Sequence, residues 1–551
     1  MLFRSTFGER IATTFTYDAN DNLIQVDHED RDPTGALNPL KPTWTSSAEY
    51  DVLNGTRLLA HELAHTVQQG SMATRFVYDG NGNLVLELLP EAVKGSDPNN
   101  TLQHQYDERD LPLRITRAPL SRDATSEEFA YDLNGSLAAL RNGVATGAGA
   151  AAGAATFTFG YDGFGRRVRL GDSMGNVETR LYDLGDNLTL SHVDGEMDDQ
   201  PGGALNRPLS EVRYAYDSLG RRIRRHVSFF DIFTELSLGD GGSTHLVSYA
   251  PNGQVLTDTD DNGNLTRYGY DTAGRLVSIT DPRTNVLTMS LDPAGNVVSR
   301  TWVERSDLSA AEEQFSITYV YDELNRCLGA TDNLGNATRS VYDSRGNCVG
   351  GIDERGNEFT RAFDGLGRVT DSLYYDGLKA AGLVVTVSHA EYSAARLVGI
   401  SDGNGNATRY DYDSLDRPVQ VTRADNSRTS LVWSPRSNLI SSTDPNGTVV
   451  QYSHDLLDRC LRRDITPGPG VAGTTTFEAF AYDGMSRVVR ATNDTSSVEF
   501  AYDSLGNRVR SIADGLLTTS VFDGEGNRLS ITYPGGRVIQ SSFAPGNLVS
   551  A

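Results

Sequence analysis

The sequence has few cysteines, no long hydrophobic run and fewer basic than acidic residues. Only three of its 551 residues are cysteine, and their spacing is not that of a zinc site. No apolar run approaches the length needed to cross a bilayer, and Met1–Arg10 shows no secretion-signal pattern. Lys and Arg number 49 against 73 Asp and Glu, and the resulting net charge of −24 argues against nucleic acid as a partner.

Several enzyme and ion-binding motifs are also missing. There is no Gly-Lys-Ser/Thr phosphate loop and no Gly-x-Ser-x-Gly nucleophile elbow. Asp258–Gly263 begins like a calcium-binding loop, but position twelve holds Gly269 instead of the bidentate Glu. We therefore expect an acidic hairpin turn there.

What the sequence does contain is one short pattern in many copies. Tyr270–Leu276 reads Tyr-Asp-Thr-Ala-Gly-Arg-Leu, and similar segments begin at Tyr161 and Tyr216. Where copies are adjacent, the step is often 21 residues, as from Tyr321 to Tyr342. A fixed period of this length indicates a repeat architecture.

A second turn signal lies half a period after each Tyr-Asp pair. Asp332–Asn336 and Asp353–Asn357 have the form Asp-x-x-Gly-Asn. Asp and Asn side chains bond their own backbone, and Gly accepts positive φ without a Cβ clash. Between the turns lie strand-length segments rich in β-branched residues, such as Leu276–Thr280. The sequence therefore predicts an all-β fold of antiparallel hairpins, one per repeat, paired side by side into one long sheet.

This frame, together with the Thr-Arg pair that precedes Tyr270, resembles the RHS/YD-repeat family. The resemblance covers most of the chain, clearly from Tyr161 to Asp523. It implies that the hairpins spiral into a hollow β-shell. Such shells enclose toxin polypeptides in bacterial effectors and insecticidal toxin complexes, and serve as adhesion scaffolds in teneurins. The implied partner is an encapsulated or neighbouring toxin polypeptide, with a further shell-forming chain as another candidate, and the implied location is secreted or cell-surface.

The repeats divide the chain by their regularity. Residues 1–160 hold degenerate copies, with an Ala/Gly-rich stretch at 142–155 that is expected to be a flexible loop or a poorly specified helix. Residues 161–551 hold regular copies. Effectors of the resembled family end in an Asp-Pro-x-Gly-Leu motif, whereas this sequence stops inside a repeat. The sequence therefore predicts a partial shell, a product truncated at its C-terminus, or one component of an assembly.

The repeat pattern breaks after Tyr50, where the residues at 56–69 predict a short helix. On that helix His61, Glu62 and His65 form His-Glu-x-x-His, the arrangement of two zinc ligands and a general base. A bound Zn²⁺ lowers the pKa of its water, and the Glu accepts the proton. The flanking residues resemble the helix of predicted zincin domains in bacterial toxin cargo proteins.

A third zinc ligand is less well marked. A metzincin is excluded, because Gln68 and Ser71 occupy the places of its Gly and His. Glu87 is the nearest candidate for a gluzincin-like ligand, and Glu91 is a weaker one. The alternative without a metal is a helical insertion that plugs one end of the shell.

Two functions follow from these observations. The favoured one is a non-enzymatic β-shell scaffold that encloses or presents a partner polypeptide of a bacterial toxin system. The alternative is a zinc-dependent metallopeptidase that uses His61 and His65 as metal ligands and Glu62 as the catalytic base. Zn²⁺ is the only cofactor that the sequence suggests.

The cysteines fit the repeat frame as structural residues. Cys327, Cys348 and Cys460 each lie six residues after the aromatic position of their repeat. Other repeats fill that position with an apolar residue, where a free cysteine behaves as a small hydrophobe. We therefore expect them to be reduced and buried.

Overall fold

The computed structural model describes residues 13–18, 22–29, 43–50, 56–62, 71–145, 154–199, 205–305, 311–379 and 383–549. These residues form strands almost throughout, and the helix among them is the five-residue α1, Pro90–Lys94. None of the described helical segments could span a membrane. The all-β fold class is confirmed.

The first strands, up to the middle of the sheet, have these bounds: β1 Thr13–Tyr17, β2 Leu23–Glu29, β3 Thr43–Tyr50, β4 Thr56–Glu62, β5 Ser71–Tyr78, β6 Leu84–Leu88, β7 Thr101–Tyr106, β8 Pro112–Arg117, β9 Thr125–Tyr131, β10 Leu137–Ala145, β11 Ala155–Tyr161, β12 Arg167–Gly171, β13 Val177–Tyr182, β14 Leu188–Gly195, β15 Arg207–Tyr216, β16 Arg222–Phe230, β17 Ser237–Tyr249, β18 Val255–Thr259, β19 Leu265–Tyr270, β20 Leu276–Thr280, β21 Val286–Leu291 and β22 Val297–Arg305.

The remaining strands are β23 Glu312–Tyr321, β24 Cys327–Asp332, β25 Ala337–Tyr342, β26 Cys348–Ile352, β27 Glu358–Phe363, β28 Val369–Asp376, β29 Leu383–Ser393, β30 Arg396–Asp402, β31 Ala407–Tyr412, β32 Pro418–Thr422, β33 Arg428–Trp433, β34 Leu439–Thr443, β35 Val449–His454, β36 Cys460–Thr466, β37 Phe477–Tyr482, β38 Val488–Asn493, β39 Ser497–Tyr502, β40 Arg508–Ala513, β41 Leu516–Phe522, β42 Arg528–Thr532, β43 Val538–Gln540, β44 Phe543–Ala544 and β45 Leu548–Val549.

Strands β1–β43 form one sheet, in which each strand pairs antiparallel with the next along the chain. Within the repeat at β19 and β20, Arg267 lies opposite Thr280. The register then shifts between Gly269 and Tyr270, and the same irregularity recurs at the aromatic position of many repeats. The predicted meander of hairpins is confirmed.

The Tyr-Asp turn between β19 and β20 shows why the motif folds as it does. The N–H of Asp271 donates to the carbonyl of Arg275 (2.9 Å), and Asp271 Oδ1 accepts the N–H of Ala273 and of Arg275 (2.9 Å each). Gly274 has φ of 82°, the left-handed conformation that a glycine adopts without strain. The sequence Asp-x-x-Gly-Arg therefore closes a three-residue hairpin loop.

The same motif joins each repeat to its neighbours. Arg275 Nε donates to Asp271 Oδ2 (2.8 Å), while its Nη1 donates to the carbonyl of Asp292 in the next repeat (2.8 Å). The hydroxyl of Tyr270 donates to the carbonyl of Val255 in the preceding repeat (2.9 Å). Other repeats that use the aromatic side chain in this way include those of Tyr106, Tyr131, Tyr161, Tyr182, Tyr216, Tyr249, Tyr321, Tyr342, Tyr392, Tyr412, Trp433, Tyr482 and Tyr502.

Many of the turn arginines also lie over the aromatic ring of the following repeat. The guanidinium carbon of Arg326 is 5.0 Å from the centroid of the Tyr342 ring, and that of Arg487 is 4.8 Å from the Tyr502 ring. A cation over an aromatic face is attracted by the ring quadrupole. The Tyr and Arg of the motif thus act between repeats, which explains why they recur with the period.

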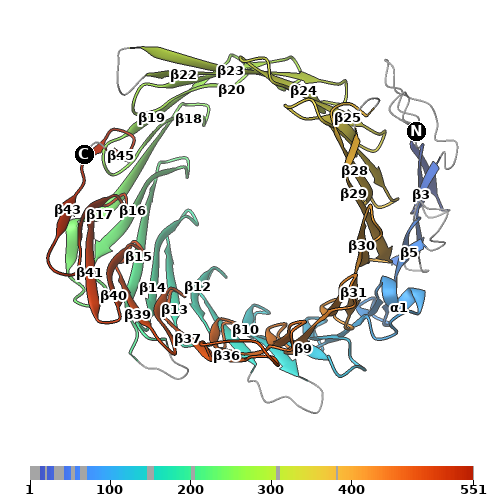
Figure 1. The fold of residues 1–551 in the computed structure, drawn as a ribbon. Coiled ribbons are helices and arrows are strands. Elements are labelled where there is room, and N and C mark those ends of the chain that lie inside the picture. Colours follow the sequence, from blue (N-terminus) through green and yellow to red (C-terminus); the bar gives the residue numbers. More distant parts are fainter. Residues whose placement is uncertain are drawn as a thin grey trace.

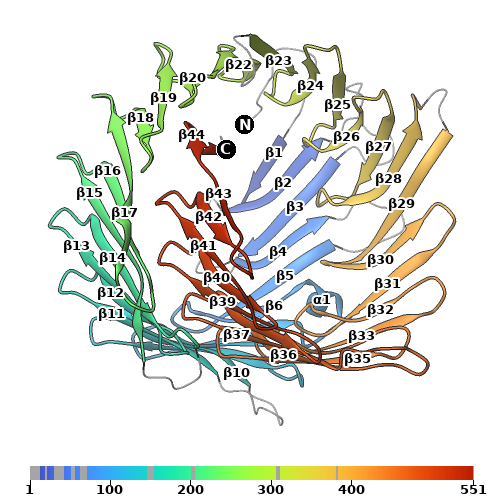
Figure 2. The ribbon, with the colours of Figure 1, turned by 60° about the vertical axis from the view of Figure 1, so that its left-hand side comes forward.

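The long sheet curls into a ring and passes beyond one full turn (Figure 1). We call the segment β1–β19 the first coil and the segment β29–β43 the second coil. The second coil lies beside the first, so that β39–β41 run next to β14–β17 (Figures 1 and 2). The wall is a single sheet over much of its course, and its fully buried apolar side chains gather near the junction of the coils: Met174, Leu209, Phe229 and Ile232.

The prediction of a helix at 56–69 is wrong for Thr56–Glu62, which form β4. Residues 63–69 lie outside the described part of the chain. β4 pairs with β3 on one side, Ser46 opposite His61, and with β5 on the other, His61 opposite Met72. Helix propensity is a weak preference, and two flanking strands that offer ladder hydrogen bonds on both edges override it.

Two smaller expectations also need correction. The Ala/Gly-rich stretch at 142–155 was expected to be a loop or a poorly specified helix; its ends are strands, because β10 continues to Ala145 and β11 begins at Ala155, and residues 146–153 lie outside the described part of the chain. Cys327, Cys348 and Cys460 are free thiols, as expected, but they are half-buried. A wall of one sheet has no deep interior in which to bury them.

Candidate functional site

The residues that the sequence singled out for zinc lie near the start of the sheet. His61 and Glu62 end strand β4, and His65 lies outside the described residues. Successive residues of a strand face opposite sides of the sheet. The helical geometry that would aim two imidazoles at one point is therefore not formed by Thr56–Glu62. Metal binding by His61 and His65, with Glu62 as base, stays a prediction from the sequence.

Glu87 has a described partner other than His61. It lies in β6, and its Oε1 is 3.1 Å from Nε2 of His104 in β7. In the register, Glu87 is opposite Phe76 of β5, whereas His61 is opposite Met72. Four residues along a strand correspond to roughly 13 Å. The backbone positions of His61 and Glu87 are thus well separated along the sheet.

Glu91, the weaker candidate, belongs to the junction of the two coils. It lies in α1 and is 1% exposed. Its Oε2 accepts hydrogen bonds from Ser96 and from the hydroxyl of Ser393 (3.1 Å), which is 302 residues away in the sequence. Within the described ranges, no group of three or more His, Cys, Asp or Glu side chains could hold a metal ion.

The junction of the coils, which we call the seam, is where the structure concentrates its polar contacts. On the first coil it uses the sister turns, those that lie half a period after the Tyr-Asp turns. On the second coil it uses the Tyr-Asp turns themselves. At one point Asn100 Nδ2 donates to the carbonyl of Ser414 (3.2 Å) and to Asp416 Oδ1 (3.1 Å), and Arg396 Nη2 donates to Asp97 Oδ2 (3.0 Å).

A buried ion pair lies further along the seam. Arg459 Nη2 of the second coil is 3.0 Å from Asp199 Oδ2 of the first, and its Nε is 2.5 Å from Asp455 Oδ2. The Asp199 and Asp455 side chains are 0% exposed and that of Arg459 is 8% exposed. Burial raises the pKa of Asp199, while hydrogen bonds from Asn176 and Arg459 act in the opposite direction.

The seam continues to the end of the sheet. His245 Nε2 lies 3.1 Å from Glu525 Oε1, and the N–H of Asp261 donates to the same oxygen (2.9 Å). Asn262 Nδ2 donates to Asp523 Oδ2 (3.0 Å). Contacts at successive repeats therefore hold the second coil on the first over a long arc.

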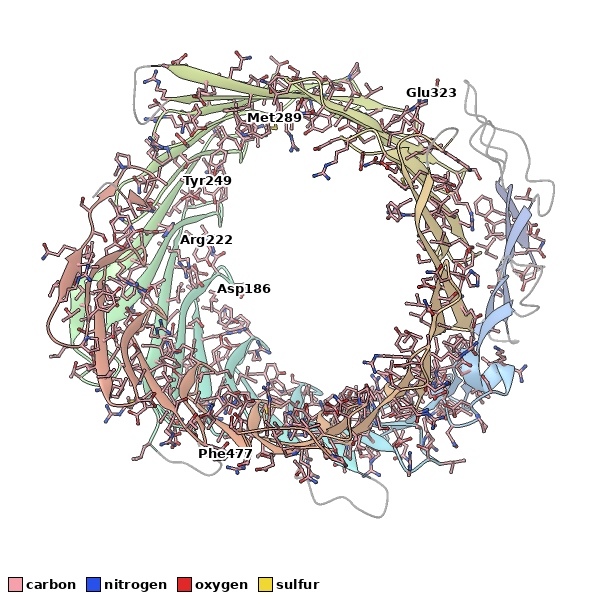
Figure 3. All side chains as sticks on the ribbon, in the orientation of Figure 1. Asp186, Arg222, Tyr249, Met289, Glu323 and Phe477 are labelled. Atoms are coloured by element: carbon pink, nitrogen blue, oxygen red, sulfur yellow. The ribbon has the colours of Figure 1, made fainter. Side chains whose placement is uncertain are left out.

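The other candidate site is the space that the ring surrounds. Side chains of the described residues project from both faces of the wall and do not reach the centre of the ring (Figure 3). Many strands carry half-buried residues on both faces, as β27 and β32 do along their whole length. A sheet that packs against a core buries one face. The described residues of this wall form no such core on its inner face.

The seam residues do not stand out in the sequence. Asp199 lies in the connection between β14 and β15, which carries no recognisable motif, and Glu91 was considered only as a weak candidate for a zinc ligand. The one feature of the sequence that could have indicated a contact there is the length of that connection. A long connection can carry a carboxylate beyond the ends of the strands. Nothing in the repeat pattern tells which Tyr-Asp turns will be covered.

Comparison with known proteins supports the family resemblance. The family model described as RHS Repeat matches residues 249–286, 270–301 and 396–428. These segments hold the regular Tyr-Asp and sister turns described above. No curated protein sequence matches the chain.

Two of the solved structures that match this chain are described as parts of toxin assemblies. One is described as the Tc holotoxin pore of Photorhabdus luminescens with a TccC3 mutation, with 14% identity, a TM-score of 0.38, and coverage of 98% of this chain and 35% of that chain. Another is described as the crystal structure of TcdB2-TccC3 without its hypervariable C-terminal region, with 14% identity, a TM-score of 0.35, and coverage of 98% and 34%. This chain therefore spans about a third of the length of those it matches.

Proposed function

We propose that this chain is an RHS-type β-shell scaffold that encloses or presents a partner polypeptide of a bacterial toxin system. The observation that carries the proposal is the ring, in which one sheet curls past a full turn and leaves the centre free of described side chains (Figures 1 and 3). A wall of this shape acts by holding a guest, and that action needs no catalytic residue.

The construction of the wall supports this role. Motif contacts between neighbouring repeats hold the sheet along its length, and the seam holds one coil to the other. The ring is therefore stabilised without a packed interior. A repeat array of this kind gains stability from contacts between neighbours and tolerates an open centre.

The charge of the chain favours a particular class of guest. The net charge of −24 gives the shell an acidic character, and a positively charged polypeptide is attracted to such a surface. We therefore propose a basic polypeptide as the guest, in a system that acts outside the producing cell.

Protease protection tests the proposal. The chain is co-expressed with the polypeptide encoded immediately beside it in the genome, and the purified complex is treated with trypsin. The guest should survive in the complex and be digested when it is alone. Small-angle scattering of the complex should also show a particle with a filled centre.

A variant of the seam provides the control. Arg459→Met removes the buried ion pair that joins the two coils. If the seam opens as a result, the guest should become accessible to trypsin. Digestion of the guest at the same rate with and without the wild-type chain would contradict the proposed enclosure. A guest that is protected but reacts with an antibody against a tag in its middle would show presentation on the outer surface instead.

A further inference from the structure

The seam shows which two edges of this sheet fit together. The sister turns of the first coil receive the Tyr-Asp turns of the second coil. This arrangement recurs at Asn100 with Ser414, at Asp199 with Arg459, and at Asp261 with Glu525. It repeats over a long arc, so it is a general property of the two kinds of edge.

Each kind of edge also occurs in a part of the ring that no described residue covers. The Tyr-Asp turns between β9 and β16 have no second coil beside them, and the sister turns of the second coil have none beyond them. In Figure 2 the turns of β11–β16 at the left and those of β28–β33 at the right stand free. We call them the Tyr-Asp rim and the sister rim.

The Tyr-Asp rim exposes large apolar side chains. Phe164 is 77% exposed and Leu219 is 69% exposed, each three residues after the aromatic position of its repeat. In the seam, the same position holds Leu415, Leu457 and Leu505, which are half-buried. The seam turns thus expose this position less than the Tyr-Asp rim does, although Met485 at the same position of the seam is still 41% exposed.

A neighbouring position on this rim shows the same contrast. Leu133 is 102% exposed and Leu184 is 98% exposed, two residues after their aromatic residues. The equivalent position in the seam holds Ser504, which is 5% exposed and bonded to the first coil. Exposed apolar side chains that recur at successive repeats along one rim make that rim a candidate interaction surface.

The same edge of the sheet carries apolar residues both before and within the second coil, and we include both parts in the sister rim. Leu334, in the sister turn between β24 and β25, is 82% exposed, and Leu516, the first residue of β41, is 60% exposed. Both rims of the chain therefore present exposed leucines among turn carboxylates and amides, whereas the leucines in the same setting of the seam are half-buried.

We infer that the Tyr-Asp rim of one chain docks on the sister rim of a second copy, so that the two sheets continue as one spiral. A covering edge must have the same curvature and the same repeat step, because contacts recur at every hairpin. A second copy of this chain has both, and it presents the very kind of edge that occupies this place in the seam. This inference concerns the rims and does not depend on a guest.

The docking is head to tail, since the two rims differ. A heterologous contact that continues a spiral advances along its axis, so it does not close into a ring and extends into longer assemblies. Each copy carries a net charge of −24, so association should strengthen as salt screens the repulsion.

Sedimentation equilibrium of the full chain tests the inference. The average mass should rise with concentration above the 59.8 kDa of one chain, and it should rise further at high salt. Leu219→Asp on the Tyr-Asp rim and Leu334→Asp on the sister rim should each weaken association at least tenfold. The control Leu120→Asp makes the same change at a side chain that is 89% exposed in the loop between β8 and β9, away from both free rims, and should associate like the wild type.

A mixture of the two rim variants gives the sharpest result. Leu219→Asp keeps a working sister rim and Leu334→Asp keeps a working Tyr-Asp rim, so together they should form a one-to-one pair of twice the 59.8 kDa chain mass and nothing larger. Circular dichroism should show the same β-sheet signal for all variants. A wild type that stays monomeric at every soluble concentration, or a mixture that stays monomeric, overturns the inference.

Discussion

Phe230 and Ser504, which are 274 residues apart in the sequence, bond to each other in both directions. The N–H of Phe230 donates to the Ser504 hydroxyl oxygen (2.8 Å), and the N–H of Ser504 donates to the Phe230 carbonyl (3.0 Å). The serine is one of the motif residues of a Tyr-Asp turn, and the phenylalanine ends strand β16 of the first coil. One short motif therefore serves as an exposed hairpin turn in one place and as a part of the seam in another.

The buried ion pair of the seam should matter more than surface pairs. In Arg459→Met, Asp199 and Asp455 lose their cation while both remain buried. We expect the free energy of unfolding to fall by about 3–5 kcal/mol, the usual cost of removing one partner from a buried pair. Urea denaturation followed by tryptophan fluorescence measures the change.

A matched control uses an exposed arginine on a strand. Arg213, 59% exposed, pairs with Glu211 at 2.9 Å. Arg213→Met should change the free energy of unfolding by less than about 1 kcal/mol. Equal losses in the two variants would mean that the seam adds nothing to the stability of the ring.

The tyrosine hydroxyls should each contribute a small amount of stability. Tyr342→Phe removes the bond to the Cys327 carbonyl (3.0 Å) and should lower the free energy of unfolding by about 0.5–1.5 kcal/mol. The next repeat has Phe363 at the same position. There, Phe363→Tyr should gain the equivalent bond to the Cys348 carbonyl. Opposite shifts of the melting temperature in the two variants would support a stabilising role for these hydrogen bonds between repeats, and shifts of the same sign would contradict it.

Acid should weaken the Tyr-Asp turns. The side-chain hydrogen bond from Arg166 lowers the pKa of Asp162 below its ordinary value of 3.8, and Arg221 does the same for the pKa of Asp217. A lowered pKa in the folded state means that the stabilisation is complete above pH 3.8 and is lost as the pH falls through the folded value. Melting temperatures measured from neutral pH to pH 3 should fall steeply at the acid end.

The contribution of Asp503 to the stability of the fold should change with pH in the opposite direction. Burial in the seam raises the pKa of Asp503, so its ionised form costs stability above the folded pKa, and that cost disappears as the pH falls.

Two asparagine variants test this difference. Asp162→Asn should reduce stability at neutral pH and make the loss of stability in acid smaller. Asp503→Asn should reduce neutral-pH stability less than Asp162→Asn does. The reverse order would contradict this assignment.

Zinc content separates the scaffold from the metallopeptidase. A scaffold is expected to purify without stoichiometric zinc and to leave casein intact. A peptidase that uses the His61 motif should contain one zinc per chain, lose it in His65→Ala, and lose casein hydrolysis in Glu62→Gln while keeping the metal. Elemental analysis of the wild type and of both variants gives the answer.

Local chemistry allowed much of the fold to be predicted from the sequence. The hairpin turn at Asp271 and Gly274 depends on contacts within five residues, and the step to the next repeat is short. The segment around His61 shows the limit of this approach. Its residues favour a helix in isolation, but β3 and β5 lie on either side and pair with it as a strand.

By itself, the sequence determined the repeat, its two turns and the all-β class, because these follow from residues that are neighbours along the chain. Only the tertiary structure decided which turns are covered. Asp271 and Asp503 belong to the same motif, yet Asp271 lies outside the seam whereas Asp503 is buried in it at 0% exposure. The reason is that the seam joins residues about 300 apart, such as Asp97 and Ser414 at 317, and their meeting depends on curvature summed over all the hairpins between them.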